Sequence, residues 1–431
     1  MHPHLAMPMT TTKRPSSETV HVITPQGDSI PAVSLIGSDG EEAVVGEFGD
    51  LVTTQRRDYI ALKFGYGISE RNLYHGGTGS HAETTPGSKL RLDTGVTSAS
   101  TVYAQSDETI IYRPGHASYL LVTPIFYGLT ADSIHRVGAY TVTPTLGSQT
   151  IMDGLLLHRR GGIWYVELWS DGVMLMGVAQ SAWDDPLDGE GQSRYRWDPG
   201  FGNVLRMTWG YLGFAPVRFY MDTDVGLINF HTIDRRNRST ALNFGLPFLP
   251  FRAEVLNGAT AASSSLEIGS VNGGVMADAQ ADPEAKHFAK SGTQSITGSP
   301  TVFVNILTLK PDATFFGKVN YIRHTMSFLS MATDGTKTFN FKVIKNATLS
   351  GTPVYTQIDA VESPMRSTND ASTVTGGHEM LSIQLSKVNN ETIKIDDHLE
   401  YMLGPEDTLT VCAQTTVTGD ASCGVRWHEF F

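Results

Sequence analysis

The chain has 431 residues, of which 40% are hydrophobic and 18% are charged, and its formal net charge is −12. This length is enough for two or three domains, each with its own core. The acidic balance argues against a nucleic-acid-binding surface, which needs clustered Lys and Arg. The short basic groups at 158–160 and 235–238 are interpreted as solvated turns. No apolar run reaches the roughly 18–20 residues that span a bilayer, so membrane insertion is not expected either.

Residues 1–50 are predicted to form an extended arm. Two turn dipeptides, Gly27-Asp28 and Asp39-Gly40, flank short apolar alternations such as residues 20–23. Ribbons of this size do not supply a core of their own. We expect this arm to attach to a neighbouring protein; a disordered or locally paired terminus is the alternative.

Residues 51–278 are predicted to form a β-sandwich. Residues 155–176 indicate a three-strand meander with turns at Gly161-Gly162 and Asp171-Gly172. Strict alternation at 205–211 and 217–221 indicates two further strands with one face on a core. No long window has a helical period; residues 279–289 are short, alanine-rich and charged, and belong to an expected linker at 279–299.

Residues 300–431 contain six or more strand signals, enough for a second antiparallel sandwich. The last two segments, 409–413 and 423–427, are predicted to pair as a hairpin around a turn at 417–419. In that register Cys412 points away from Cys423, so both thiols are expected to stay free. Two cysteines in so long a chain also suit assembly in a reducing cytoplasm.

Three groups of residues carry a family resemblance. They are an Arg-Pro-Gly turn at 113–115, the sequence WGYLG at 209–213 followed by VRF at 217–219, and GPEDTLT at 404–410 followed by WHEF at 427–430. These motifs resemble those of virion structural proteins of tailed bacteriophages. The resemblance implies an all-β chain with an N-terminal arm, a lectin-like or jelly-roll β-sandwich and a C-terminal antiparallel β-sandwich.

The function that the resemblance implies is that of a structural component of the virion, assembled in the host cytoplasm. We expect a peripheral tail fibre or appendage protein that contacts other virion proteins through its arm and contacts a host-surface glycan. Fibres of this kind are commonly homotrimers. A capsid decoration or head-fibre protein is one alternative, and a carbohydrate-binding or depolymerase protein is the other.

Catalytic and metal motifs are not found. The chain lacks the metalloprotease, phosphate-loop, nucleophile-elbow and Cys-x-x-Cys patterns, so no enzyme, cofactor or metal is predicted. Glycan hydrolysis needs two facing carboxylates, and their separation cannot be read from a sequence. Candidates for such a pair are Asp153, Glu167, Asp184, Asp185 and Glu254. Acidic groups at 184–190 and 222–224 could ligate Ca²⁺, but polar loops are the favoured interpretation.

Tryptophan is concentrated in one region. Five of the six Trp residues fall between 164 and 209, interspersed with Tyr. Aromatic rings in strands mostly pack in cores or interfaces, although they also stack on sugars. Trp183 and Trp197 lie in a segment rich in Asp, Gly and Pro, so these two are the candidates for exposed glycan contacts.

Overall fold

The fold is all-β, as predicted, in a computed structural model of the chain. Among the described residues the only helical element is a 3-10 turn at Gln180–Ala182, and no helix could cross a membrane. The chain divides into two units, 1–53 and 54–431. The structure describes residues 21–23, 29–31, 56–68, 73–78, 83–84, 88–111, 115–143, 150–210, 213–259, 262–276, 286–320, 322–333, 337–386, 390–394, 402–404 and 407–430.

The first unit contains the predicted ribbon. Strands β1 (His21–Ile23) and β2 (Ser29–Pro31) pair antiparallel, with Val22 opposite Ile30. Both turn dipeptides, Gly27-Asp28 and Asp39-Gly40, lie outside the described residues. A two-stranded ribbon of this length buries too little surface to be stable alone.

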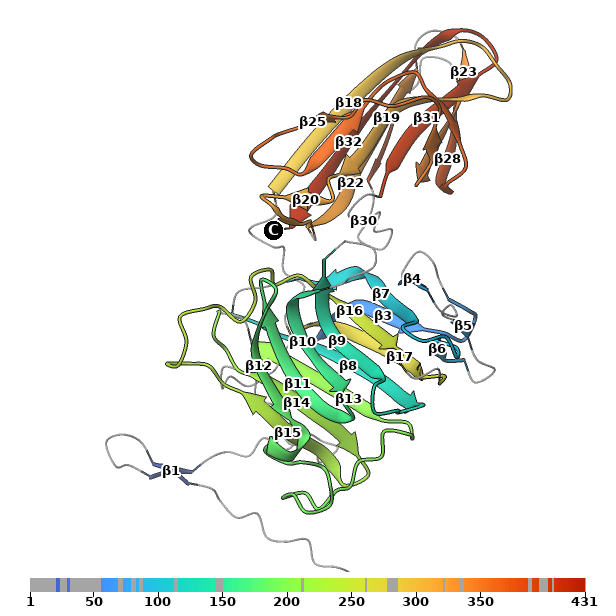
Figure 1. Ribbon diagram of the computed structural model, residues 1–431. Helices are drawn as coiled ribbons and strands as arrows, with labels where there is room; N and C mark the ends of the chain where they lie inside the picture. The colour runs from blue at the N-terminus through green and yellow to red at the C-terminus, as the bar shows by residue number, and fades with distance from the viewer. Residues whose placement is uncertain are drawn as a thin grey trace, which may run out of the picture. The chain divides into compact units, whose positions relative to one another are not determined.

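The N-terminal sandwich of the second unit has two antiparallel sheets (Figure 1). Sheet 1 has the order β12-β11-β10-β9-β16-β7-β4, that is Val173–Ala179, Ile163–Ser170, Ile151–Arg160, Ile134–Val142, Leu249–Leu256, Thr101–Ile110 and Leu73–Gly77. Sheet 2 has the order β15-β14-β13-β8-β17-β6-β5, that is Gly226–Ile233, Val217–Thr223, Val204–Gly210, Ala117–Tyr127, Ser265–Met276, Leu90–Asp93 and Glu83–Thr84, and β3 (Arg56–Lys63) also pairs with β17.

The predicted meander at 155–176 is confirmed as β10, β11 and β12. Both glycines of the Gly161-Gly162 turn and both residues of the Asp171-Gly172 turn have positive φ, which is the conformation that a tight two-residue hairpin turn requires. The two strands predicted at 205–211 and 217–221 are also confirmed, as β13 and β14, and they pair with Met207 opposite Phe219. Alternate residues of both sheets, such as Leu155, Val166 and Phe219, fill one apolar core between them.

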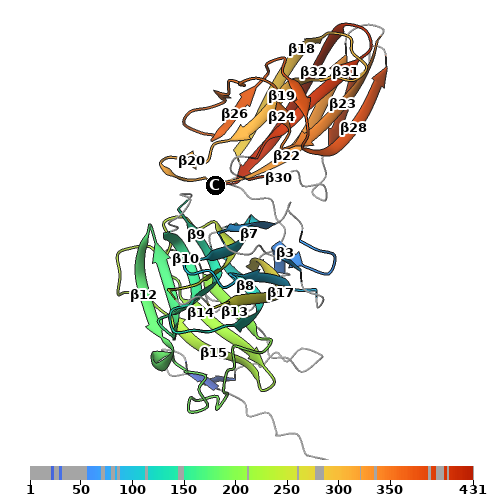
Figure 2. The same ribbon diagram turned by 45° about the vertical axis from the view of Figure 1, so that its right-hand side comes forward.

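The C-terminal sandwich also has two sheets (Figure 2). Sheet 3 has the order β18-β32-β22-β29, that is Lys286–Ile296, Gly419–Phe430, Arg323–Thr333 and Asn390–Lys394, with β30 (Met402–Leu403) also on β22. Sheet 4 has the order β24-β27-β19-β31-β23-β28, that is Thr348–Leu349, Thr373–Thr375, Phe303–Pro311, Leu409–Thr415, Thr338–Lys345 and His378–Ser386, with β25 (Thr356–Gln357) and β26 (Met365–Thr368) beside β19. Strands β20 (Thr314–Phe315) and β21 (Lys318–Val319) form a small hairpin.

Two expectations for this half are wrong. The linker at 279–299 contains β18, which pairs along its whole length with β32. The terminal segments do not pair with each other: β31 lies between β19 and β23 in sheet 4, whereas β32 lies between β18 and β22 in sheet 3. Both strands send their alternate apolar residues into the same core, so their pattern is the same as that of a hairpin.

The expected separation of the cysteines nevertheless holds. Cys423 lies in the core between sheets 3 and 4, whereas Cys412 packs with Ile344 and Val374 in a separate cluster. Both are buried and free. Burial raises the pKa of each thiol to about 12, which makes both poor nucleophiles at neutral pH.

Candidate functional site

The outer face of sheet 1 carries charged and aromatic side chains, whereas the side chains of its inner face pack in the core. On β10 and β11, Leu157 and Val166 point into the core, so the residues at alternate positions, His158 and Glu167, point outward. We call this outer surface the polar face. It comprises Tyr103, Gln105, Arg136, Tyr140, His158, Arg160, Tyr165, Glu167, Trp169, Arg252 and Glu254.

Strand register arranges these residues in rows across adjacent strands. One row crosses five strands, β11-β10-β9-β16-β7, and consists of Tyr165, His158, Arg136, Glu254 and Tyr103. Strands β9 to β12, which are neighbours in this sheet, are labelled in Figure 1.

The neighbouring row, displaced by two residues along each strand, contains Glu167, Leu156, Gly138, Arg252 and Gln105. The two rows together place two carboxylates and two guanidinium groups near the middle of the sheet.

A continuous chain of polar contacts joins the two carboxylates. The Arg136 Nη1 atom lies 2.8 Å from Glu254 Oε2, and Arg136 Nε donates to His158 Nε2 at 3.3 Å. The other ring nitrogen of His158, Nδ1, lies 2.9 Å from Glu167 Oε2. Because Nε2 accepts a hydrogen bond, the proton of the neutral ring is assigned to Nδ1, which donates to the Glu167 carboxylate.

Glu167 receives two further contacts. The indole Nε1 of Trp169 donates to Glu167 Oε2 at 2.9 Å, and Arg160 Nη2 lies 3.2 Å from Oε1. Burial raises the pKa of Glu167, but the hydrogen bonds from His158 and Trp169 and the charge of Arg160 lower it further, so the net shift is downward. Burial also lowers the pKa of His158 and outweighs the attraction of Glu167. At neutral pH the pair is therefore a carboxylate and a neutral imidazole.

Arg252 and Tyr103 form the other side of the polar face. Arg252 Nη1 donates to Gln105 Oε1 at 2.9 Å, and its guanidinium lies 4.2 Å from the centre of the Tyr103 ring. Arg252 Nη2 also lies 3.8 Å from Glu254 Oε1, and both side chains are only 2% exposed. The aromatic rim above this buried floor is half-buried: Tyr103, Tyr165 and Trp169 all retain some exposed surface.

This arrangement is better suited to binding than to proton transfer. A buried ionic network is seldom more stable than well-packed apolar side chains, so its presence on a strand face points to a function. A glycosidase needs one carboxylic acid with a raised pKa as its proton donor. Glu167 has a lowered pKa instead, and no group of metal-ligating side chains occurs among the described residues.

The structure brings together two of the five candidate carboxylates. Glu167 and Glu254 share the polar face, whereas the other three fix loops. Asp153 accepts the backbone N–H groups of Asp171 and Gly245, and Asp185 accepts those of Leu187 and Ser193. Asp184 accepts the backbone N–H of Thr232. The loop interpretation of residues 184–190 is consistent with these contacts.

The expected exposure of Trp183 and Trp197 is wrong. They are 4% and 7% exposed. Trp197 packs 4.9 Å from Trp164, and Trp183 packs 4.7 Å from Phe230. Their indole N–H groups are satisfied by Val178 O and Asn203 Oδ1. The segment between β12 and β13 thus folds over the core and covers the ring faces that a sugar would need.

Sequence reasoning missed the cationic half of the site. Residues 158–160 were expected to form a solvated turn, but they are the last residues of β10, and His158 and Arg159 are buried. Arg252 and Glu254 alternate with apolar residues in β16. Charged residues at every second position of an otherwise apolar strand are the signal that could have indicated a polar outer face.

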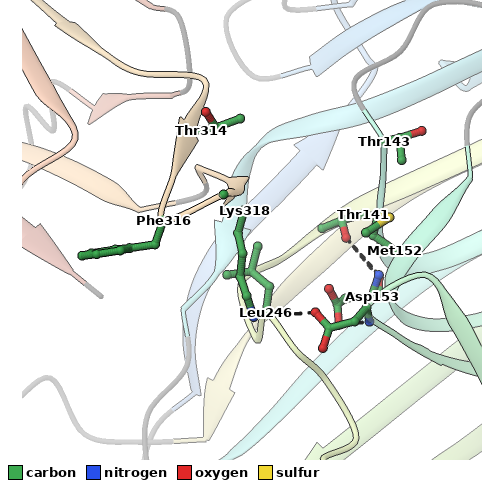
Figure 3. A pocket seen from close by; sticks show the side chains of 10 residues that line it. Thr141, Thr143, Met152, Asp153, Leu246, Thr314, Phe316 and Lys318 are labelled. Carbon is green, nitrogen blue, oxygen red and sulfur yellow. Dashed lines mark hydrogen bonds and ion pairs between the residues drawn. The ribbon is translucent and has the colours of Figure 1, made fainter.

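A cavity of about 490 Å³ is a weaker candidate. Figure 3 shows Met152, Asp153 and Leu246 of the N-terminal sandwich and Phe316 and Lys318 around the β20–β21 hairpin, which line it. Asp171 also lines the cavity. Its charged groups are already used. Lys318 Nζ donates to Gly245 O at 2.9 Å and lies 3.6 Å from Asp171, and Asp153 holds the loop described above.

Comparisons with known proteins return structural similarity only. No family model and no curated protein matches the chain. A legume lectin-like domain from Entamoeba histolytica is similar at 14% identity, covering 49% of this chain and 95% of that one, with a TM-score of 0.32. The Emp46p carbohydrate recognition domain in its potassium-bound form is similar at 11% identity, with coverages of 50% and 95% and a TM-score of 0.33.

A prokaryotic β-1,3-1,4-glucanase derived from a mouse hindgut metagenome is similar at 8% identity, covering 51% of this chain and 99% of that one, with a TM-score of 0.35. At such identities and TM-scores, neither the ligands nor the activity of these proteins follow for this chain.

Proposed function

We propose that the protein binds a glycan on the polar face of sheet 1. The observation that carries this is the row Tyr165, His158, Arg136, Glu254 and Tyr103, in which aromatic rings flank a network of fixed donors and acceptors. Sugar rings present apolar C–H faces and a rim of hydroxyl groups, which aromatic rings and planar polar side chains complement. Because the network fixes its own side chains, little conformational entropy is lost when a ligand binds.

Binding without hydrolysis is the form of this function that the site supports. Glu167 and Glu254 are both engaged by arginine, and the lowered pKa of Glu167 leaves no proton to give to a leaving group. A depolymerase is therefore the less favoured variant.

The setting that we propose is a tailed-phage particle. The motifs at 113–115, 209–219 and 404–430 support a virion structural protein, and the ribbon β1–β2 belongs to a unit separate from residues 54–431. A peripheral fibre or appendage protein, trimeric and attached through residues 1–50, would present the polar face to the host surface. The alternative is a location on the capsid, as a decoration protein.

Glycan-array binding of the purified full-length protein tests the proposal. We expect binding to at least one glycan class, and we expect Trp169→Ala and Tyr165→Ala each to weaken it about tenfold or more, as for aromatic anchors in binding sites. Tyr66→Ala, at a fully exposed tyrosine that follows β3, is the matched control and should bind as the wild type does.

Failure of every glycan to bind, or equal binding by the Trp169 and Tyr165 variants, would contradict the proposal. Release of reducing ends from a bound glycan would show that the protein hydrolyses the glycan rather than only binding it. Mass spectrometry of purified particles tests the setting, because absence of the protein from them would exclude a virion role.

A further inference from the structure

The charges of the polar face are sorted by depth. The side chains of Glu167 and Glu254 are 0% and 2% exposed, and that of Arg252 is 2% exposed. Exposure then rises through Arg136, at 16%, to Arg160, at 44%. Both carboxylates therefore lie at the floor, and the charges that an incoming molecule meets are guanidinium groups.

The net charge of the polar face is also positive. Among its described residues, three guanidinium groups of Arg136, Arg160 and Arg252 stand against the two carboxylates, and His158 is neutral at pH 7 because its pKa is lowered by burial. The face is thus locally cationic in a chain whose formal charge is −12. A positive site on an acidic protein favours an anionic ligand by local contact rather than by long-range attraction.

Arg160 is positioned to receive such a ligand. Its guanidinium lies 4.5 Å from the centre of the Tyr165 ring, which restricts where the group can move. Its polar contacts within the described residues use Nη2 alone, with Glu167 Oε1 at 3.2 Å and Met174 Sδ at 4.0 Å. The two N–H groups of Nη1 remain available, and a charged N–H donor makes a strong hydrogen bond to a carboxylate oxygen.

We propose that the glycan bound on the polar face carries a carboxylate, as hexuronic and nonulosonic acids do, and that Arg160 is the residue that selects it. This inference rests on the proposed glycan-binding function. The acidic sugar places a carboxylate oxygen against Nη1 of Arg160, and its hydroxyl groups face the row through Arg136. Glu167 holds the guanidinium from below.

The test compares one oligosaccharide in two forms, by calorimetric titration of the full-length protein. One form contains a hexuronic acid, and the other is the same chain with the carboxyl group reduced to a primary alcohol. The wild type should bind the acidic form about 10- to 100-fold more tightly, as expected for a hydrogen-bonded charge pair. A sialylated oligosaccharide and its carboxyl-reduced form make a second arm, which distinguishes the two sources of the carboxylate.

Variants at one position then assign the selectivity. Arg160→Gln should bring the affinity ratio of the two forms to within about threefold of one, and Arg160→Lys, which keeps the charge but not the planar guanidinium, should restore part of the ratio. Arg366→Gln is the matched control. Arg366 has the same 44% exposure and its own carboxylate partner, Asp312, in the C-terminal sandwich, so its variant should keep the wild-type ratio. Unchanged tryptophan fluorescence and melting temperature confirm that each variant is folded.

The outcomes distinguish the carboxylate inference from the proposed glycan-binding function. Equal affinity of the wild type for the acidic and reduced forms, in both arms, would overturn the carboxylate inference while leaving glycan binding in place. A full acidic preference in Arg160→Gln would overturn the role of Arg160, and tighter binding of a sulfated glycan than of the carboxylated one would overturn the choice of anion. Failure of all forms to bind would instead contradict the proposed function itself.

Discussion

Replacement of Arg136 by Met should destabilise the N-terminal sandwich by about 3 kcal/mol. The substitution removes the 2.8 Å partner of Glu254, whose side chain is 2% exposed, and it removes the donor to His158 Nε2. Breaking one side of a buried ion pair typically costs about 3–5 kcal/mol, because the remaining charge stays buried without compensation. The lower end applies here because Arg252 remains 3.8 Å from Glu254.

A double-mutant cycle isolates the pair. Neutralising both partners, in Arg136→Met with Glu254→Gln, removes the buried carboxylate as well as the guanidinium. Arg252 loses its 3.8 Å contact with Glu254 in the Glu254→Gln single variant and in the double variant alike, so this loss cancels in the cycle. We expect a coupling energy of about 2 kcal/mol. Five of the six Trp residues lie in the N-terminal sandwich, so tryptophan fluorescence during urea or thermal unfolding reports mainly on this half.

The melting temperature of Arg136→Met should fall by about 6–12 °C, at roughly 2–4 °C per kcal/mol for a domain of this size. A loss below about 1 kcal/mol, or strictly additive single substitutions, would show that Glu254 is hydrated and that the network is not a preorganised buried unit.

Three further predictions concern the rest of the chain. Thiol titration should find two free thiols per chain, Cys412 and Cys423, reactive only after denaturation, since both are buried; a disulfide in unreduced protein would contradict the sheet assignment of β31 and β32. Burial lowers the pKa of His135 to about 4, so between pH 6.5 and 4 the unfolded chain binds a proton that the folded chain does not. The wild type should therefore lose stability as the pH falls through this range, and His135→Gln should lose less, by up to about 1.4 kcal/mol per pH unit. Identical pH profiles of the two proteins would refute this. Removal of residues 1–45 should leave the thermal transition and oligomeric state unchanged but prevent incorporation into particles, and normal incorporation would move the attachment site to residues 54–431.

Much of the fold could be predicted because local patterns decide it. The meander of β10, β11 and β12 is specified by two turn dipeptides with positive φ and by alternation between them. The terminal segments show where this reasoning stops. Leu409 on β31 and Val425 on β32 face one core from opposite sheets, and alternation alone does not distinguish that arrangement from a hairpin.

The site was only partly predictable for a similar reason. Glu167 and Glu254 could be chosen as candidates by residue type, but their connection through Arg136 and His158 also depends on the pairing of β9 with β16, a strand that is far from β9, β10 and β11 in sequence. The polar character of their segment predicts exposure for Trp183 and Trp197. Their burial depends on where that segment folds, and composition does not contain this information.

The central claim is that the polar face of sheet 1 is a glycan-binding surface. A structure of the full-length protein with the tightest-binding oligosaccharide from the array tests it most directly. The account predicts a sugar lying across β9, β10 and β11, with a ring against Trp169 or Tyr165 and a polar contact to Arg160. A sugar bound in the cavity beside Lys318, or on the C-terminal sandwich, with the polar face unoccupied, would contradict it.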